Sequence, residues 1–292
     1  MEKMVIIIDL DGTLLDYNGE VSKENREAIK KSMEKGAKVI LASGRMPIAL
    51  KNYALDVGTD KYIICGNGAI VYDIEKDERI YENIMTKKKA LSIIDICEKN
   101  SIYYSVYTES AIICKTLEYN VLAYNSDNAK KEENRKTNIN VVENVYEYID
   151  KINTQHILKI NVCESNKVIF DGILKKIRRI PNISILEISN KVSKTIKAGT
   201  EQVDVEYFYA EISNKNVNKW TAIEELMKVL KFKAKDVIAI GDNANDKKMI
   251  ENAGIGIIMG NGALVGQTEK GKIVSDNDKN GVAEGLVKYY LK

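Results

Sequence analysis

The chain has 292 residues, a formal net charge of +2 and 29% charged residues. This length is sufficient for a large apolar core and favours two domains. The nearly balanced charge gives no strong basic field for nucleic acid, and no run reaches the roughly 18 apolar residues of a membrane-spanning helix, so we expect neither nucleic acid nor a membrane as a partner.

The first predicted element is a strand over residues 5–8, whose four residues are all apolar, as in a buried parallel strand. Asp9 ends this strand, a second carboxylate follows at Asp11, and Gly12 allows a sharp turn. Two carboxylates at the end of a core strand repel each other unless a cation compensates them, and their hard oxygen atoms favour Mg²⁺. An ordinary polar turn remains the alternative, whereas the spacing of a calcium loop is absent.

The next elements alternate between helices and strands. A helix is predicted over 23–35, strands over 38–42 and 62–65, and a further helix between these two strands. This alternation predicts an α/β fold with a doubly wound parallel sheet, in which ligands bind at the carboxyl ends of the strands. Ser43 and Asn67 follow two of those ends.

Between residues 84 and 212 the pattern changes to shorter, more aromatic and more strictly alternating segments. Strands are predicted over 102–107 and 205–212, and the polar residues 125–140 are predicted to form a loop. We therefore expect a mixed α+β insertion in this part of the chain.

The first pattern resumes near residue 218. Lys219 stands at the start of a predicted helix, where the helix dipole disfavours a purely structural lysine, although a solvated lysine is the alternative. An apolar strand over 236–240 ends in a second acidic loop, which contains Asp242 and Asp246. Two strands that end in carboxylates make a Mg²⁺ site physically reasonable. Later strands over 255–259 and 272–274 and a closing helix over 286–291 complete the pattern.

A phosphate site also needs hydrogen-bond donors and positive charge. Ser43 and Gly44, which follow a strand, offer a hydroxyl and backbone N–H groups, although Ser-Gly is also common in simple turns. Lys219 offers an ammonium. A glycine-rich run over 254–260 resembles a dinucleotide-binding fingerprint, but its spacing differs and it runs through a predicted strand.

Taken together, these segments resemble the Cof-type branch of the haloacid dehalogenase-like phosphatases over essentially the whole chain. The matching segments are 9–15, 42–45, 67–69, Lys219, 241–246 and 249–250. The resemblance implies a Rossmann-like catalytic core formed by residues 1–83 and 213–292. It also implies that residues 84–212 form an inserted α+β cap domain that sets substrate specificity.

The resemblance also implies roles for single residues. Asp9 would be the nucleophile and a Mg²⁺ ligand. Asp11 would be the general acid and base and would bind Mg²⁺ through its backbone carbonyl. Asp242 would complete the protein ligands, with support from Asp246. Phosphate would be held by Leu10, Ser43, Gly44, Lys219 and Asn245. This chain has Trp220 where the family usually has glycine, and Ser43 where threonine is common.

The function that we predict is a Mg²⁺-dependent phosphomonoester hydrolase acting on a small phosphorylated metabolite. A sugar phosphate, pyridoxal phosphate or flavin mononucleotide is the substrate that the resemblance suggests. A phosphomutase on the same fold and a non-catalytic phosphate-binding regulator remain as alternatives. The four scattered cysteines and the lack of an apolar N-terminal segment favour a cytoplasmic protein with free thiols. No pattern indicates the oligomeric state.

Overall fold

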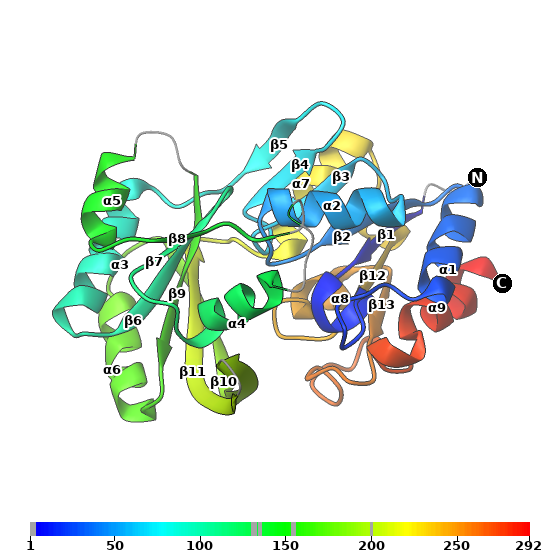
Figure 1. Cartoon of the computed structure of the whole chain (residues 1–292). Coiled ribbons are helices and arrows are strands. Elements are labelled where there is room, and N and C mark those ends of the chain that lie inside the picture. Colours follow the sequence, from blue (N-terminus) through cyan, green and yellow to red (C-terminus); the bar gives the residue numbers. More distant parts are fainter. Residues whose placement is uncertain (1–3, 130–132, 134–135, 153–155, 199–200) are drawn as a thin grey trace. The chain divides into compact units, whose positions relative to one another are not determined.

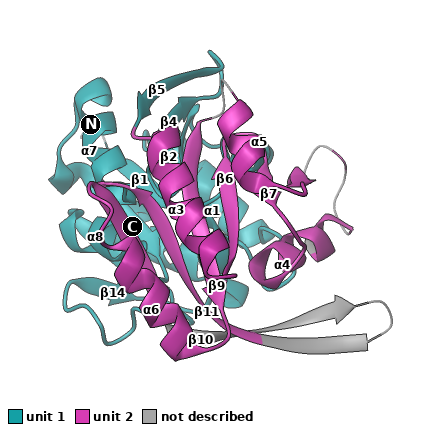
Figure 2. Cartoon of the chain, turned by 90° about the vertical axis from the view of Figure 1, so that its left-hand side faces the viewer, with its two compact units in different colours: residues 1–82, 217–292 teal, residues 83–216 magenta. Residues whose placement is uncertain are grey.

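The structure is a computed structural model that describes residues 4–129, 133, 136–152, 156–198 and 201–292, without the side chains of residues 127, 188–198 and 201–205. The chain divides into two compact units, which Figure 2 shows in different colours. Unit 1 comprises Met1–Glu82 and Val217–Lys292, and unit 2 comprises Asn83–Asn216. The second unit is thus inserted between two segments of the first.

Within the described part of unit 1, the strands form one sheet in the order β14-β13-β12-β1-β2-β3-β4-β5 (Figure 1). The pairs from β14 to β3 are parallel, whereas β3 with β4 and β4 with β5 are antiparallel. The strands are β1 (Val5–Ile8), β2 (Lys38–Ala42), β3 (Tyr62–Cys65), β4 (Ile70–Asp73), β5 (Glu78–Glu82), β12 (Val237–Gly241), β13 (Ile255–Ile258) and β14 (Gly271–Ile273).

The register of the central strands brings their carboxyl ends to one edge of the sheet. Ile8 at the end of β1 pairs with Ile240 of β12 on one side and with Leu41 of β2 on the other. All four residues of β1 are buried, so both faces of the sheet are covered, as is usual for parallel sheets. The polar residues that follow these three strands are therefore neighbours in space.

Helices cover the sheet of unit 1. Helices α7 and α8 pack with the apolar side chains that β1, β2 and β12 share on one face, and α1 packs against β2 and α9. The helices are α1 (Lys23–Glu34), α2 (Pro47–Val57), α7 (Lys219–Leu230), α8 (Lys247–Asn252) and α9 (Gly281–Leu286). The predicted α/β fold with a parallel-sheet core is confirmed. The closing helix begins at Gly281, earlier than predicted. The sequence pattern missed this start because Gly281 and Gly285 give that stretch a low helix propensity.

Unit 2 contains a second sheet in the order β10-β11-β9-β6-β7-β8, mostly antiparallel. Its strands are β6 (Tyr103–Thr108), β7 (Ile112–Cys114), β8 (Ile139–Val141), β9 (Ile157–Glu164), β10 (Ile183–Ala198) and β11 (Glu201–Asn214). Its helices are α3 (Lys87–Lys99), α4 (Tyr119–Asn128), α5 (Val145–Lys151) and α6 (Lys167–Ile177). This composition agrees with the predicted α+β insertion.

The predicted loop over residues 125–140 is wrong at both of its ends. Helix α4 continues to Asn128, and β8 begins at Ile139, while residues 130–132 and 134–135 lie outside the described residues. The Asn128 side chain donates to the Thr137 carbonyl at 2.7 Å and accepts from its N–H at 2.8 Å. These contacts join the end of α4 to Thr137, two residues before β8, which the composition of the segment does not indicate.

Two other features of the described residues concern the cysteines and the lengths of the helices. All four cysteines are buried and carry free thiols. No helix in the described ranges is both long and apolar enough to cross a lipid bilayer.

Candidate active site

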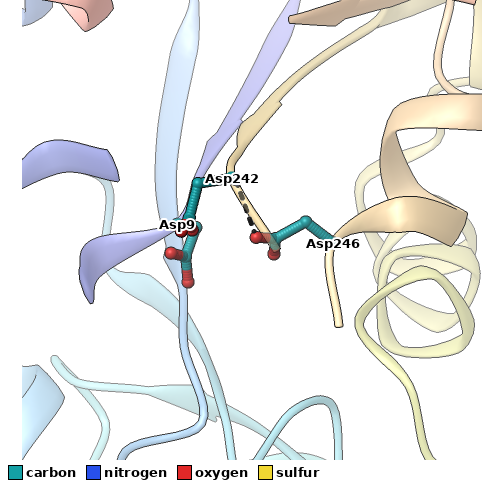
Figure 3. Close-up of side chains that lie close together, drawn as sticks. All are labelled: Asp9, Asp242 and Asp246. Carbon is teal, nitrogen blue, oxygen red and sulfur yellow. Dashed lines mark hydrogen bonds between the residues drawn. The ribbon is translucent and has the colours of Figure 1, made fainter. Parts of the chain in front are cut away.

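Three carboxylates converge at the carboxyl ends of β1 and β12 (Figure 3). One oxygen from each of Asp9, Asp242 and Asp246 lies within 4.8 Å of the others. Asp9 extends the pairing of the strands, because its N–H donates to the Ile240 carbonyl at 2.9 Å. Asp9 and Asp246 are buried, and Asp242 is less deeply buried. The sheet register therefore creates the cluster, as two neighbouring strands both end in acid.

Lys219 lies among these carboxylates. Its ammonium donates to Asp9 Oδ1 and, at 2.6 Å, to Asp246 Oδ1, and its side chain is fully buried. The lysine is the first residue of α7, whose N-terminus is capped by the Asn218 side chain. The alternative of a solvated lysine is therefore wrong. Trp220, the departure from the family pattern, packs in the apolar core and leaves the lysine in the site.

Asp246 also shapes the loop that follows β12. Its Oδ2 atom accepts from the backbone N–H groups of Asp242 at 3.0 Å and Asn243 at 3.1 Å. A Cβ atom at Gly241 would lie 2.5 Å from the Cβ of Asp246, so only glycine allows this close approach. Asp246 Oδ1 accepts from Lys219, and its Oδ2 accepts from the loop N–H groups. Asp246 is therefore placed to support the site.

The loop after β1 carries Leu10, whose side chain is buried, and Asp11, whose side chain is 56% exposed. Gly12 follows with φ of +80°, and a Cβ atom there would lie 2.7 Å from the Asp242 carboxylate. Thr13 donates its hydroxyl to Asp242 Oδ1 at 3.2 Å. The first acidic loop thus packs directly on the second.

Arg45 is a site residue to which the sequence analysis assigned no role. Its guanidinium makes two contacts with the Asp11 carboxylate, from Nε at 2.8 Å and from Nη2 at 2.5 Å. The guanidinium also lies 4.9 Å from the centre of the Tyr53 ring. The sequence did offer a signal for this role, since Arg45 directly follows Ser43 and Gly44 at the end of a buried strand. A charged side chain in such a place is rarely buried without a partner.

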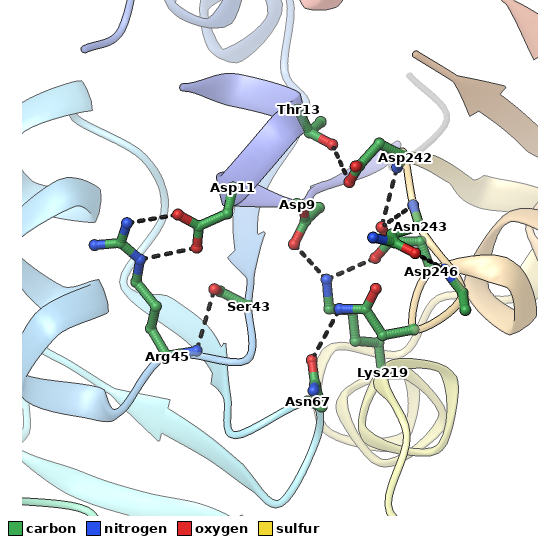
Figure 4. A network of polar contacts seen from close by, with 12 residues as sticks. Asp9, Asp11, Thr13, Ser43, Arg45, Asn67, Lys219, Asp242, Asn243 and Asp246 are labelled. Carbon is green, nitrogen blue, oxygen red and sulfur yellow. Dashed lines mark hydrogen bonds and ion pairs between the residues drawn. The ribbon is translucent and has the colours of Figure 1, made fainter. Parts of the chain in front are cut away.

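Of the residues expected to hold phosphate, Ser43 and Lys219 are labelled in the network of polar contacts that Figure 4 shows. Ser43 is buried and its Oγ accepts from the Arg45 N–H at 3.2 Å. Asn245 donates to Asn67 Oδ1 at 3.1 Å, and a Cβ atom at Gly44 would lie 3.1 Å from that same oxygen. Asn67 therefore connects the loops after β2, β3 and β12, although the sequence analysis gave it no role in phosphate binding.

The electrostatics of the cluster show an excess of negative charge. Burial, and then the nearby Asp246, raise the pKa of Asp9 well above its ordinary value, and Lys219 only partly opposes this. Burial and Asp246 likewise raise the pKa of Asp242 to about 7, against the lowering effects of Lys219 and the Thr13 hydroxyl. Burial lowers the pKa of Lys219, but the carboxylates of Asp246 and Asp9 outweigh it and the net change is upward.

These groups fit a divalent metal ion. Three ionised carboxylates beside one ammonium leave two negative charges in a largely buried site, which a divalent cation would neutralise. Oxygen donors are the ligands that hard cations such as Mg²⁺ or Ca²⁺ prefer. The cluster of Asp9, Asp242 and Asp246 could therefore hold a metal.

A parallel sheet whose neighbouring strands β1 and β12 end in acidic residues beside a buried lysine defines an α/β protein with a carboxylate-rich candidate active site. The chain belongs to the haloacid dehalogenase-like hydrolases, since the model of that family matches residues 6–286. The resemblance noted in the sequence is thereby confirmed.

Relatives and solved structures agree with this assignment. Phosphatase YwpJ of Bacillus subtilis is 28% identical and the match covers 98% of this chain and 99% of the relative. The 5-amino-6-(5-phospho-D-ribitylamino)uracil phosphatase YwtE of the same organism is 28% identical over 95% of each chain. A solved haloacid dehalogenase-like hydrolase from B. subtilis has 24% identity, with 99% and 100% of the two chains covered and a TM-score of 0.79. The relatives' names agree with the predicted enzyme class, a phosphatase.

Proposed function

We propose that the protein is a Mg²⁺-dependent phosphomonoester hydrolase that acts on a small phosphorylated metabolite through a phosphorylated Asp9. The observation that carries this proposal is the placement of Lys219 between Asp9 and Asp246 at the ends of β1 and β12. Full-length similarity to YwpJ, named a phosphatase, and to YwtE, named for a small phosphorylated substrate, supports the same class of reaction.

In the first step the Asp9 carboxylate attacks phosphorus in line with the ester oxygen. The bond between Asp9 and phosphorus forms as the bond to the leaving oxygen breaks, and Asp11 gives its proton to that oxygen. In the second step Asp11 takes a proton from water, the water oxygen attacks phosphorus, and the Asp9 carboxylate leaves. The products are the alcohol and inorganic phosphate.

Several residues are proposed to stabilise the phosphoryl group. The Lys219 ammonium, which contacts Asp9, would offset negative charge on the phosphoryl oxygens. The Ser43 hydroxyl, the backbone N–H groups of Leu10 and Gly44, and the Asn245 amide would donate hydrogen bonds. The contact of Asn245 with Asn67 fixes the direction of that amide.

Mg²⁺ is the metal that we propose, because phosphate chemistry and carboxylate oxygens both favour it. Asp9, Asp242 and the backbone carbonyl of Asp11 would hold the ion, and Asp246 would support them. When bound, the ion supplies positive charge that allows a phosphate dianion to lie beside carboxylates. We further propose that residues 84–212, nearly all of unit 2, act as the cap that selects the substrate.

Two substitutions test this mechanism with p-nitrophenyl phosphate. Asp9→Asn removes the nucleophile, so no covalent phosphate forms and turnover is undetectable. Asp11→Asn keeps the nucleophile but removes the base, so hydrolysis of the intermediate slows by roughly 10²–10⁴-fold. Because an aryl leaving group needs little protonation, Asp11→Asn releases a burst of p-nitrophenol and gains the mass of one phosphoryl group on Asp9.

Asp171→Asn provides a matched control, since Asp171 is an exposed aspartate of α6 that pairs only with Lys167 among the contacts described. It should retain normal turnover and acquire no phosphate. Activity in Asp9→Asn, or a phosphoryl group on another residue of Asp11→Asn, would refute the proposed mechanism.

A further inference from the structure

The loop that follows β13 lies against the acidic loop that follows β12. Its first residue, Met259, donates its N–H to the Gly241 carbonyl at 3.0 Å, and Leu264 donates its N–H to the Asp242 carbonyl at 3.2 Å. Between them, a Cβ atom at Gly262 would lie 2.6 Å from the Asp242 carbonyl oxygen, so the two backbones approach as closely as only glycine allows. The loop after β13 therefore restrains the backbone of Asp242.

Asn261 extends the contacts of this loop to the other acidic loop, which follows β1. Its side-chain amide donates to the Gly12 carbonyl at 2.9 Å, and its Oδ1 atom accepts from the Asn277 N–H at 2.9 Å. Both ends of the amide are engaged, so a flipped amide would lose both hydrogen bonds. Gly12 directly follows Asp11, whose backbone carbonyl is a proposed metal ligand. One side chain therefore joins the loops after β1, β13 and β14.

The backbone angles at Gly12 show what this hydrogen bond restrains. Asp11 has φ of −79° and ψ of 119°, and Gly12 has φ of 80° and ψ of 0°, which are the angles of a type II turn. The Asp11 carbonyl belongs to the central peptide of that turn. Leu10, at the start of the turn, accepts from the Leu15 N–H at 3.0 Å, and Asn261 holds the Gly12 carbonyl near its end. The loop after β13 thus helps to set the direction of the Asp11 carbonyl.

We propose that Asn261 is a positioning residue of the metal site, which holds the turn of Asp11 and Gly12 against the loop of Asp242 and so raises the affinity for a divalent cation such as Mg²⁺. A carbonyl oxygen carries no net charge, so its attraction for a cation depends on the direction of its dipole. Groups that orient metal ligands commonly change the affinity for the metal by roughly 10–100-fold. The inference rests on the metal site of the proposed function.

The test measures Mg²⁺ binding through the melting temperature of the protein. A ligand that binds only the folded state stabilises it by an amount set by the ligand concentration and the dissociation constant. Asn261→Ala should raise the Mg²⁺ dissociation constant by about tenfold or more, so that the same rise in melting temperature above the metal-free value needs about tenfold more Mg²⁺. An unchanged dissociation constant in this variant would overturn the inference.

The matched control is Asn277→Ala. The Asn277 side chain is 3% exposed and donates to the Leu15 carbonyl at 2.7 Å, so it too joins an amide to the loop after β1. The backbone N–H from which Asn261 accepts is retained. Asn277→Ala should lower the metal-free melting temperature at least as much as Asn261→Ala, but leave the Mg²⁺ dissociation constant within about twofold of the native value. Equal increases of the dissociation constant in both variants would overturn the inference.

A second variant, Asn261→Ser, covers the case in which Asn261→Ala does not fold. Serine keeps a polar side chain in the loop but lacks the amide. The same rise in the Mg²⁺ dissociation constant is expected, and an unchanged constant in this folded variant also overturns the inference.

The titration involves no turnover, which separates this inference from the proposed function. If Mg²⁺ stabilises the native protein but the protein releases phosphate from no compound, the proposed function fails while the comparison of variants still decides the inference. If the native protein hydrolyses phosphate esters and Asn261→Ala binds Mg²⁺ as tightly as it does, the inference alone is overturned. A native protein that Mg²⁺ does not stabilise at any concentration overturns the inference as well.

Discussion

The Arg45 guanidinium donates two hydrogen bonds to the Asp11 carboxylate, from Nε to Oδ2 at 2.8 Å and from Nη2 to Oδ1 at 2.5 Å. The Arg45 side chain is 12% exposed and the Asp11 side chain is 56% exposed. The largely buried arginine therefore restrains the more exposed aspartate. The Tyr53 ring lies against the guanidinium. The position of the proposed general acid is therefore set by a residue of the loop after β2, not by its own loop alone.

Replacing Arg45 by Lys should impair the step in which Asp11 donates its proton. Lysine keeps the charge but cannot make the two-point contact, so the carboxylate is held less firmly. We expect kcat/KM for an alkyl phosphate, which reports formation of the phosphorylated enzyme, to fall by roughly tenfold or more, and kcat/KM for p-nitrophenyl phosphate to fall less, because its leaving group needs little protonation. Steady-state kinetics with both substrates measures the difference.

The control for this variant is Arg26→Lys. Arg26 contacts Asp56 at 2.8 Å in the same unit, and neither residue belongs to the proposed site. Its kinetics should match those of the native protein. Equal losses on the two substrates in Arg45→Lys would show that Arg45 does not act through the proton of Asp11.

Removing the metal should abolish activity. Without a cation, a phosphate dianion would have to approach Asp9, Asp242 and Asp246 against their charge. We expect EDTA to stop phosphate release from p-nitrophenyl phosphate and an excess of Mg²⁺ to restore it. EDTA that is already saturated with Mg²⁺ serves as the control and should have no effect. Full turnover in free chelator would exclude the metal.

Lys219→Met should reduce turnover by roughly 10²-fold or more, the scale for loss of one charged contact in the transition state. It should also destabilise the metal-free protein by about 3–5 kcal/mol, because two buried carboxylates lose their ammonium partner. Lys228→Met in the same helix removes an exposed pair with Glu225 and should cost under about 1 kcal/mol. Urea unfolding measures both, and equal stability losses would contradict the buried ion network.

In the metal-free protein, the stability contributed by the carboxyl group of Asp242 should fall as the pH rises from about 4 to 7. The pKa of Asp242 is raised to about 7 in the folded state, while in the unfolded chain it has its ordinary value near 4. Between these values the folded state binds more protons than the unfolded state, so the free energy of unfolding falls with rising pH. The full effect is on the order of 4 kcal/mol.

This pH dependence can be assigned by comparison with Asp242→Asn, which lacks the titrating group and should show a flatter profile over the same range. Saturating Mg²⁺ should flatten the native profile in the same way. The measurement is urea unfolding at a series of pH values. Parallel profiles for the native protein and Asp242→Asn would mean that this carboxylate does not resist ionisation.

Unit 1 should fold without unit 2. All strands of its described sheet come from its own two segments, Met1–Glu82 and Val217–Lys292. The residues that follow the first segment and precede the second lie close together. Asn83 donates to the Lys215 carbonyl at 3.0 Å, and Asn214 donates to Asn83 at 2.6 Å. Replacing residues 84–215 by a short Gly-Ser linker should leave a cooperative thermal transition and cleavage of p-nitrophenyl phosphate. A protein without such a transition would show that unit 1 depends on unit 2.

Local patterns in the sequence identified much of the fold. The predicted strands 5–8, 38–42 and 62–65 agree with β1, β2 and β3 residue for residue, and α1 begins at Lys23 as predicted, with Ser22 as its N-cap. These features depend on apolar periodicity and on capping, which involve only near neighbours along the chain. The loop expected over 125–140 was wrong at its two ends, where α4 continues to Asn128, β8 begins at Ile139, and Asn128 bonds to Thr137.

The order of the strands in the sheet could be determined only from the tertiary structure. That β1 lies between β2 and β12 follows from pairing between residues distant in sequence, such as Ile8 with Ile240. Single positions such as Asp9 and Lys219 could be named from motifs, because strand ends and helix starts have local signatures. Their mutual contact could not, since it depends on that long-range register.

The partners of the site residues were decided in the same way. No spacing rule pairs Arg45 with Asp11 or Asn67 with Asn245, and only the packed loops bring these groups within hydrogen-bond distance. The burial of Asn161 is likewise invisible in β9 alone, where a lysine and an asparagine two residues apart also suit a solvent-facing strand. Lys159 and Asn161 are nevertheless buried, and only the tertiary structure showed this, because burial depends on residues that are distant in the sequence.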